Sequence, residues 1–291
     1  MVQDKTFGSR LFDIVNYVLL AIIGIVTFLP FVHVVAGSFT TSAEMAAKKF
    51  ILIPTVYSLD AYQYIFSTGT IFRAMFVSIY VTVLGTAFSM LITALFGYAL
   101  ARRDLDGRRI LMFLVVFTML FNGGLIPTFL VVRELGLIDS YGALVLPIAI
   151  NAFNLIILKN FFQNIPDGLE ESAKIDGCND FGILFRIVLP LSLPALATIS
   201  LFYAVTYWNT YLNAIMYLND SMKWPIQVLL RQIVILASGL DSDASLDSEV
   251  PPPDQAVKMA VIVVATLPIL AVYPFLQKHF AKGALLGSIK G

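Results

Sequence analysis

Six long stretches without a charged residue determine what this chain can fold into. None contains Asp, Glu, Lys or Arg, and they cover residues 14–43, 74–101, 110–132, 140–158, 187–219 and 259–277. Each is about as long as, or longer than, the roughly 20 apolar residues that a helix needs to cross a bilayer. Lipid offers no hydrogen bonds to an open backbone, so such stretches fold as helices. We therefore expect transmembrane helices near residues 12–36, 72–100, 110–132, 141–159, 192–213 and 257–276.

The composition supports the same class of protein. Hydrophobic residues make up 58% of the chain and charged residues 13%, whereas a soluble domain carries roughly a quarter charged residues. The formal net charge is zero, which argues against a nucleic-acid partner. The composition therefore predicts an all-α integral membrane protein in which residues 1–291 form one domain with six transmembrane helices.

The distribution of Lys and Arg predicts the orientation in the membrane. An even number of spans places both termini on the same side. With the termini in the cytoplasm, twelve of the nineteen Lys and Arg residues fall inside, including four in the short stretch 102–109. Positive charge is enriched in cytoplasmic loops. We therefore expect cytoplasmic termini, a cytoplasmic loop at 160–191, and external loops at 37–71 and 214–256.

The cytoplasmic loop has the pattern of two short helices. Asp167 followed by Glu170 matches a capping box, which would begin the first helix at this point. Gly177 would end that helix, and Asn179 or Asp180 would begin the second. The second helix would carry an apolar stripe with helical spacing, formed by Phe181, Leu184, Phe185 and Val188.

The same loop resembles the EAA loop of ABC-importer permeases, in which Glu-Ala-Ala is followed by three residues, Gly, nine residues and Ile-x-Leu-Pro. Here Glu171-Ser172-Ala173 precedes Gly177 by three residues, and Ile187-Val188-Leu189-Pro190 follows after nine more. The one departure is Ser172, a small residue in place of alanine. The plain alternative is a surface helix pair that only links two spans. The resemblance implies that the loop couples the permease to an ATPase through Glu170, Glu171, Ser172, Ala173, Asp176, Gly177, Ile187, Leu189 and Pro190.

Other segments extend the resemblance over nearly the whole chain. The sequences at 97–102, 135–140 and 208–212 look like the corresponding parts of carbohydrate importer permeases of the maltose type. The nearest likeness is to the oligosaccharide and polysaccharide branch, which includes alginate importers. The implied fold is that of a type I ABC importer permease in the bacterial cytoplasmic (inner) membrane.

The resemblance also implies partners. These are a second homologous permease, two copies of a cytoplasmic ATPase that uses ATP and Mg, an external solute-binding protein and a carbohydrate substrate. In the family the EAA glutamate, matched here by Glu171, pairs with a basic group of the ATPase. The dipeptide Gly-Lys is absent from this chain, which excludes a Walker A phosphate loop. We expect no cofactor, metal site or catalytic residue in the chain itself, and hence no enzyme.

Sugar recognition uses aromatic rings for stacking and amides or hydroxyls for hydrogen bonds. Residues of these types occur around the third and fifth predicted spans. An interfacial aromatic belt, or an Asn that joins two helices, would give the same pattern. A non-sugar solute is an alternative cargo, and an ion-coupled secondary transporter an alternative function, although such transporters usually carry charges within their spans. The candidate substrate path consists of Asn122, Tyr203, Tyr207, Trp208, Asn209, Tyr211 and Asn213.

Overall fold

The computed structural model describes residues 7–237 and 255–288, and within these ranges every regular element is a helix. The helical class expected from the sequence is therefore confirmed for the described part of the chain. One isolated antiparallel bridge joins Thr40 to Tyr57. The middle of the predicted external loop 214–256, residues 238–254, lies outside the described residues. Contacts divide the chain into two compact units, Met1–Ile71 with Leu230–Leu267 and Phe72–Leu229 with Pro268–Gly291.

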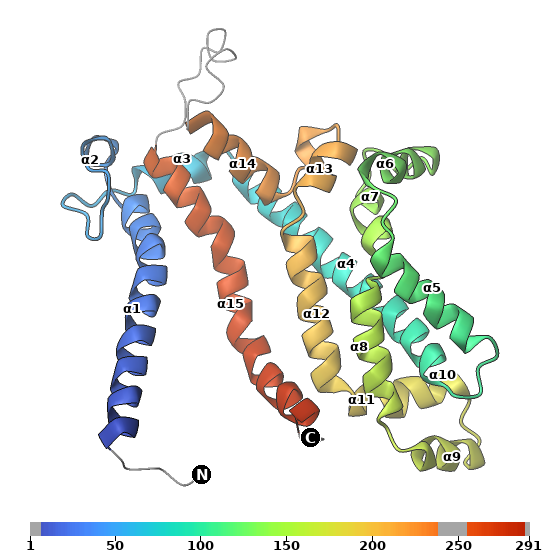
Figure 1. Cartoon of the computed structure of the whole chain (residues 1–291). Helices are drawn as coiled ribbons and strands as arrows, with labels where there is room; N and C mark the ends of the chain where they lie inside the picture. Colours follow the sequence, from blue (N-terminus) through green and yellow to red (C-terminus); the bar gives the residue numbers. More distant parts are fainter. Residues whose placement is uncertain (1–6, 238–254, 289–291) are drawn as a thin grey trace. The chain divides into compact units, whose positions relative to one another are not determined.

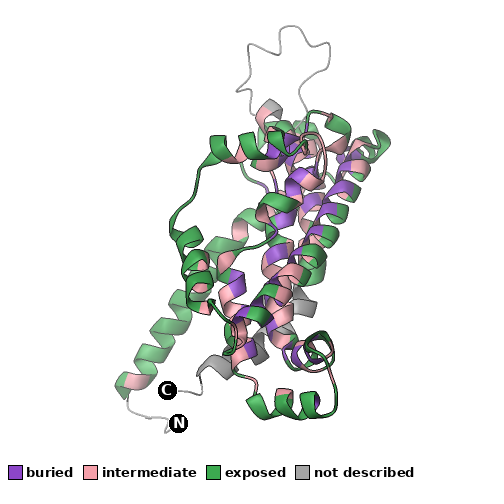
Figure 2. Cartoon of the chain, turned by 90° about the vertical axis from the view of Figure 1, so that its right-hand side faces the viewer, coloured by how far each residue is buried: buried purple, intermediate pink, exposed green. Residues whose placement is uncertain are grey.

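The first unit begins with a long apolar helix. Helix α1 (Phe7–Ser38) has 32 residues and includes the range 12–36. Its side chains are almost all exposed, and Figure 2 shows it as green along most of its length. The helix is therefore held by few contacts in the isolated chain. The other helices of this unit are α2 (Ser42–Ala47), α3 (Asp60–Ser67), the end of α14 (Ile226–Ala237) and the first part of α15 (Gln255–Ser288).

The connection between α1 and α3 is organised by one carboxylate, that of Glu44. It accepts hydrogen bonds from Thr40 Oγ1 at 2.8 Å and from Lys48 Nζ at 2.7 Å. The backbone N–H groups of Thr55 and Val56 donate to it as well. The Lys48 ammonium and these N–H groups hold the pKa of Glu44 well below its usual range. A loop of mixed sequence is thus tied together at a single side chain.

The second unit contains most of the helices. Its element bounds are α4 (Thr70–Ala101), α5 (Arg108–Leu120), α6 (Leu125–Glu134), α7 (Gly142–Val145), η1 (Leu146–Ile148), α8 (Ala152–Gln163), α9 (Asp167–Ile175), α10 (Asp180–Ile183), the π-helical η2 (Leu184–Val188), α11 (Leu189–Leu191), α12 (Leu193–Trp208), α13 (Leu212–Tyr217) and η3 (Ser221–Lys223). Figure 1 shows α9 to α11 at one end of this unit and α6, α7 and α13 at the other.

The predicted helix near 110–132 is divided into two helices in the structure. Helices α5 and α6 meet at 117° across a break of a few residues. Gly124 adopts a φ of +93°, a conformation that L side chains rarely reach. The side-chain oxygen of Asn122 accepts the N–H of Gly124 at 2.9 Å, a local bond that competes with the helical one. Two glycines and this asparagine therefore end α5 at Leu120.

The other predicted helices differ from the observed ones at their ends. The fourth range, 141–159, is bent by 56° before α8, which continues to Gln163. Asn151 is the N-cap of α8, and its side-chain oxygen accepts a hydrogen bond from the N–H of Asn154 at 3.1 Å. The fifth helix stops at Trp208 instead of 213, and the sixth extends beyond 276. Among the residues that the structure describes, three helices are long and apolar enough to cross a membrane alone, and three bent pairs meet the same test together.

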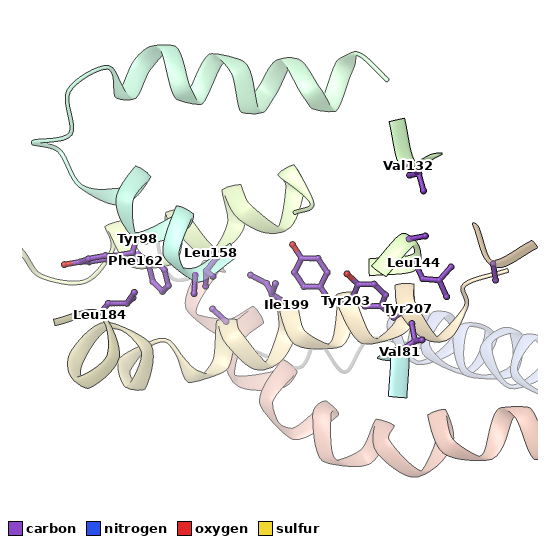
Figure 3. Close-up of a cluster of buried hydrophobic side chains, with 14 of the residues drawn as sticks. Val81, Tyr98, Val132, Leu144, Leu158, Phe162, Leu184, Ile199, Tyr203 and Tyr207 are labelled. Carbon is purple, nitrogen blue, oxygen red and sulfur yellow. The ribbon is translucent and has the colours of Figure 1, made fainter. Parts of the chain in front are cut away.

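The core of the second unit lies along α12, where it packs on α4 and α8. Figure 3 shows Tyr203 and Tyr207 in a row with Ile199 on this helix, with Leu158 and Phe162 at one end of the row. Hydroxyl groups link the two long helices: Tyr203 Oη lies 2.7 Å from Thr93 Oγ1, and Tyr207 Oη lies 2.7 Å from Ser89 Oγ. The seam between α4 and α12 is therefore close-packed and hydrogen-bonded.

Candidate coupling site and substrate path

Helix α9 begins differently from the capping-box prediction. Its N-cap is Pro166, and no side chain caps it. Asp167 is instead the first helical residue, so the predicted capping box is wrong. Proline at φ −59° and ψ 128° already turns the chain into the helix. Both Asp167 and Glu170 lie in the first turn, where the positive end of the helix dipole stabilises negative charge.

Helix α9 ends as predicted, at Gly177. This glycine has a φ of +83°. Its N–H bonds to the carbonyl of Lys174 at 3.0 Å, and the N–H of Cys178 bonds to that of Ala173 at 2.9 Å. These two bonds form a Schellman motif, which glycine favours because it has no Cβ. The hydroxyl of Ser172 donates to Gly168 O at 2.8 Å, so the serine is satisfied by its own helix.

The second short helix confirms one prediction and corrects another. Asn179 is its N-cap and accepts the N–H of Gly182 at 2.7 Å. The predicted apolar stripe is wrong in half of its members: Leu184 and Val188 are buried, but Phe181 and Phe185 are 67% and 49% exposed. The helix passes into a π-helical stretch at Leu184–Val188. Its i→i+5 bonds rotate successive residues away from the spacing of an α-helix.

The end of the EAA-like segment turns sharply into α12. Ile187 and Leu189 are half-buried against the core, and Pro190 is exposed in α11. The segment Asp180–Leu191 then meets Leu193–Trp208 at 87°. The two short helices of the segment are thus connected to the core helix through a single bend.

The acidic residues of α9 face a cavity of about 230 Å³. Glu171 is exposed and Glu170 is half-buried, while Asp176 is the C-cap residue and is also exposed. The cavity lies between α9, the end of α8 and the turn after α4. Its lining is Ala101, Arg102, Arg103, Asp104, Phe162, Gln163, Ile165, Asp167, Glu170, Glu171 and Lys174.

The turn after α4 contributes residues that the sequence prediction did not place at the coupling site. Arg102 donates from Nε and Nη2 to the two carboxylate oxygens of Asp104, at 2.9 and 2.7 Å. Its Nη1 donates to the carboxylate of Asp180. This pairing raises the pKa of Arg102 and lowers that of Asp104 to about 2. Two features of the sequence could have indicated this contact: two arginines directly follow a helix, and an aspartate stands at the start of each short helix.

The structure separates the candidate path residues into groups. Tyr203 and Tyr207 are buried in the seam described above, and Tyr203 Oη also accepts the N–H of Asn151 at 3.0 Å. Trp208 is 5% exposed, and its Nε1–H has no hydrogen-bond partner among the described residues. In this conformation the two tyrosine hydroxyls are occupied by the fold, whereas the tryptophan N–H is unpaired.

The remaining path residues lie at helix ends. Asn122 is exposed at the break between α5 and α6. Asn209 is exposed and donates from Nδ2 to Val205 O at 2.8 Å, where it ends α12. Tyr211 and Asn213 follow it and are half-buried. The amide and aromatic groups after Trp208 therefore form one local cluster along the chain.

These observations can be set beside known proteins. Residues 93–285 match the family described as binding-protein-dependent transport system inner membrane component. The matched range contains the whole EAA-like segment and α12. This chain belongs to that family. It is accordingly a membrane permease of the ABC importer type, and the family is non-catalytic.

Individual relatives agree over the full length. The chain is 70% identical over 284 residues to the polygalacturonan/rhamnogalacturonan transport system permease protein YtcP of Bacillus subtilis, covering 97% of this chain and 99% of that protein. It is 55% identical to the protein LplC of the same organism, with 99% and 98% covered. A crystal structure of a bacterial ABC transporter involved in the import of the acidic polysaccharide alginate matches with a TM-score of 0.87 and 34% identity, covering 94% and 98%. This permease therefore shares its fold as well as its family with these proteins.

Proposed function

We propose that this permease moves a carbohydrate, delivered as an oligosaccharide or polysaccharide by an external solute-binding protein, through an importer driven by a separate ATPase. The relative that is 70% identical is named for transport of two galacturonan polymers, and the structural relative belongs to an alginate importer. Both kinds of polymer contain uronic acids. These likenesses support a cargo derived from an acidic polysaccharide, ahead of a neutral sugar or a non-sugar solute.

The observation that carries the coupling role is the form of α9. It is a short helix with a firm glycine end, it has the spacing of an EAA loop, and it leaves Glu171 exposed. A partner ATPase with a basic group in its docking cleft would meet this glutamate. Seated there, a rigid helix transmits a rigid-body displacement better than a flexible loop would.

The assembly proposed around this chain contains a second homologous permease, two copies of the ATPase and one binding protein. ATP and Mg would be bound by the ATPase copies. We also propose six membrane spans, which requires each bent helix pair to serve as one span or as part of one. Both termini would then be cytoplasmic, in line with the positive charge of residues 102–109.

The proposed substrate path runs past the end of α12, near Trp208, Asn209, Tyr211 and Asn213, and includes Asn122. An unpaired indole N–H in a buried position is a donor that still needs an acceptor, and sugar hydroxyls are acceptors. Tyr203 and Tyr207 would contribute to this path only in a conformation that opens the seam between α4 and α12.

The orientation can be tested with the single cysteine. Cys178 follows Gly177 directly and is half-buried. In intact cells it should resist a membrane-impermeant maleimide, and it should react in inverted vesicles once the ATPase has been stripped away. Labelling from outside intact cells would reverse the orientation.

The coupling role can be tested with Glu171→Lys. This variant should insert normally but should lose co-purification with the ATPase, or stimulation of ATP hydrolysis by the loaded binding protein. Glu134→Lys is the control, because Glu134 is also exposed but ends α6, at the other end of the second unit (Figure 1). Normal transport by Glu171→Lys would show that this glutamate is only a solvated residue.

The cargo can be tested in proteoliposomes that contain the complete complex. Oligogalacturonate bound to the binding protein should stimulate hydrolysis and accumulate inside, and a neutral oligosaccharide of equal length should do neither. Stimulation by the neutral sugar alone would contradict the acidic cargo. The permease alone should neither hydrolyse ATP nor accumulate solute. Uptake driven by an ion gradient without ATP would instead indicate a secondary transporter.

A further inference from the structure

Two successive arginines at the end of α4 each meet the first residue of one short helix in the EAA-like segment. Arg103 Nη1 lies 3.6 Å from the carboxylate of Asp167, which begins α9. Arg102 Nη1 is paired with the carboxylate of Asp180, which begins α10. One end of a long core helix therefore contacts both short helices at equivalent places.

The charges at these contacts agree with the helix dipoles. The C-terminal end of a helix is the negative end of its dipole, which stabilises arginine just after Ala101. The N-terminal end is positive, which stabilises Asp167 and Asp180 at the first positions of α9 and α10. Each ion pair thus joins the favourable residue at the end of one helix to the favourable residue at the start of another.

All three nitrogens of the Arg102 guanidinium group donate hydrogen bonds. Nε and Nη2 donate to the two carboxylate oxygens of Asp104. Nη1 donates to the carboxylate of Asp180 and, at 3.4 Å, to the hydroxyl of Tyr98. Its carbon Cζ also lies 5.9 Å from the centre of the Tyr98 ring. A lysine has a single ammonium group and cannot make this set of contacts.

The anchor of this arrangement, Arg102, is half-buried. The Arg102 side chain is 16% exposed, whereas that of Arg103 is 77% exposed. Tyr98, one turn before Arg102, belongs to the core cluster together with Phe162 and Leu184. Arg102 therefore extends from the core of the unit to the coupling segment, and Arg103 adds a solvated contact beside it.

The route continues from α4 into α12. The hydroxyl pairs of Thr93 with Tyr203 and of Ser89 with Tyr207 connect these two helices over the next turns. A displacement that reaches α4 is thus passed to the helix that leads to the proposed substrate path. The backbone also connects the segment to α12 directly, through the bend of 87° between α11 and α12.

We propose that Arg102 and Arg103 are positioning residues that clasp the coupling segment to α4, so that α9, α10 and α4 move as one body when the ATPase closes. Neither arginine needs to touch the ATPase or the substrate in order to do this. This inference rests on the proposed coupling role of the EAA-like segment. It means that movement passes from the segment to the core through the two arginine ion pairs as well as through the bend between α11 and α12.

The test uses the complete complex with its binding protein and compares four variants with the parent. These are Arg102→Lys, Asp180→Asn, the two combined, and Arg109→Lys as the control. Arg109 lies close by in the chain, in the first turn of α5, and makes no ion pair with any described residue. The measurements are co-purification with the ATPase, the stimulation of hydrolysis by loaded binding protein, and the solute taken up per ATP hydrolysed.

We expect Arg102→Lys and Asp180→Asn each to retain the ATPase but to lose about fivefold in uptake per ATP, at the low end of typical coupling energies. The combined variant should be no worse than either single one, because both remove the same contact. Arg109→Lys should match the parent. Normal uptake per ATP in both single variants, or losses that simply add, would overturn the clasp.

A second set of variants tests the exposed pair of Arg103 and Asp167, in case the half-buried Arg102 is needed for folding. Arg103→Asp and Asp167→Arg should each reduce uptake per ATP, and the double exchange should restore it. A merely structural role would not predict recovery on exchange. Glu171→Lys separates the two levels of the proposal: if it abolishes coupling while all clasp variants are normal, the coupling segment stands and the clasp is wrong. If Glu171→Lys is normal too, the coupling role itself fails.

Discussion

Lys223 Nζ lies 2.6 Å from Asp139 Oδ2 and 2.7 Å from the backbone carbonyl of the same residue. Asp139 Oδ1 also accepts the N–H groups of Asn219 and Asp220, and its own N–H bonds to Tyr217 O at 2.7 Å. Asp139 has a φ of 60°, a conformation that aspartate tolerates better than most residues. The turn before α7 is thus fixed to the turn after α13 at one residue.

Asp139→Ala should therefore lower the unfolding temperature of the purified permease more than Asp139→Asn does. Asparagine retains an acceptor and accepts a positive φ, whereas alanine has neither property. Thermal unfolding in detergent, followed by the fluorescence of Trp224, measures the difference. Equal stability of the two variants would show that the backbone bonds are held by something other than this side chain.

The pH dependence of this contact has a defined sign. The Lys223 ammonium and the N–H of Asp220 lower the pKa of Asp139 from its ordinary 3.8, so the carboxylate contributes fully above that value. The contribution is lost as the pH falls below 3.8 through the lowered pKa. Asp139 raises the pKa of Lys223 above 10.5, so that contribution is lost only as the pH rises beyond 10.5. Between these limits Asp139→Asn should show a stability deficit that does not vary with pH.

Gly85→Ala should separate α4 from α12. A Cβ built at Gly85 would lie 2.8 Å from the ring of Tyr207, closer than any real contact. Because the ring is held at its hydroxyl by Ser89, overpacking should cost about 1–3 kcal/mol. Gly24→Ala in α1 has no atom within 4 Å of the added carbon and is the matched control. Combining Gly85→Ala with Tyr207→Leu should recover part of the loss, and an unchanged stability of Gly85→Ala alone would contradict the packing.

Tyr203→Phe should be more destabilising than Tyr207→Phe. Removing the Tyr203 hydroxyl leaves both Thr93 Oγ1 and the N–H of Asn151 without this partner. The Tyr207 hydroxyl also has two partners, but only the bond to Ser89 is short, and the one to Val145 O is 3.4 Å long. Hydrogen bonds between membrane helices contribute about 0.6 kcal/mol on average and up to about 1.7 kcal/mol. Chemical unfolding in mixed micelles ranks the two variants. The reverse order would mean that the Asn151 bond contributes nothing.

Glu44→Gln should open the connection between α1 and α3 to protease. The Glu44 side chain is 8% exposed and forms an ion pair with Lys48, which is followed by Lys49. With the charge removed, trypsin should cut after Lys48 or Lys49 faster than in the parent. Asp60→Asn, at the first residue of α3, serves as the control for loss of a carboxylate.

Acid should have the same effect on the parent protein as Glu44→Gln. The pKa of Glu44 is held far below its ordinary 4.5, so the contribution is present above 4.5 and is lost as the pH falls below it. As the pH is lowered, an acid-stable protease should cleave this connection faster in the parent, whereas its cleavage rate in Glu44→Gln should change little. Equal cleavage of parent and variant at neutral pH would show that Glu44 does not hold this connection together.

The positions of the helices could be predicted because hydrophobicity and charge act locally along the chain. The charge-free stretches located α1 and α4, and the capping residues located both ends of the first short helix and the start of the second to within a residue. Asn179 and Gly177 succeeded because a side-chain cap and a positive φ depend on only a few neighbours. The breaks after Leu120 and before Ala152 depend on whether a local bond wins over the helical one, and hydropathy does not carry that information.

The candidate path shows where local reasoning stops. A tyrosine near a helix end suits a sugar site, an interfacial belt or a core equally well. The deciding fact for Tyr203 and Tyr207 is that Thr93 and Ser89 face them from more than a hundred positions away in the chain. The role of Arg102 was hidden for the same reason, because its partner Asp180 is 78 residues distant. The apolar stripe failed at Phe181 and Phe185, which are exposed although their helical spacing to Leu184 and Val188 is correct in the sequence.

The break between α5 and α6 constrains which part of this permease lipid can reach. Helix α5 has 13 residues and rises about 20 Å, less than the roughly 30 Å of a hydrocarbon layer. With Arg108 and Arg109 at the headgroups, residues 121–124 fall within that layer. Acyl chains cannot accept or donate the hydrogen bonds of an open backbone. These residues are exposed in the single chain, so under the proposed six-span topology they would face protein or water in the assembled importer and not annular lipid.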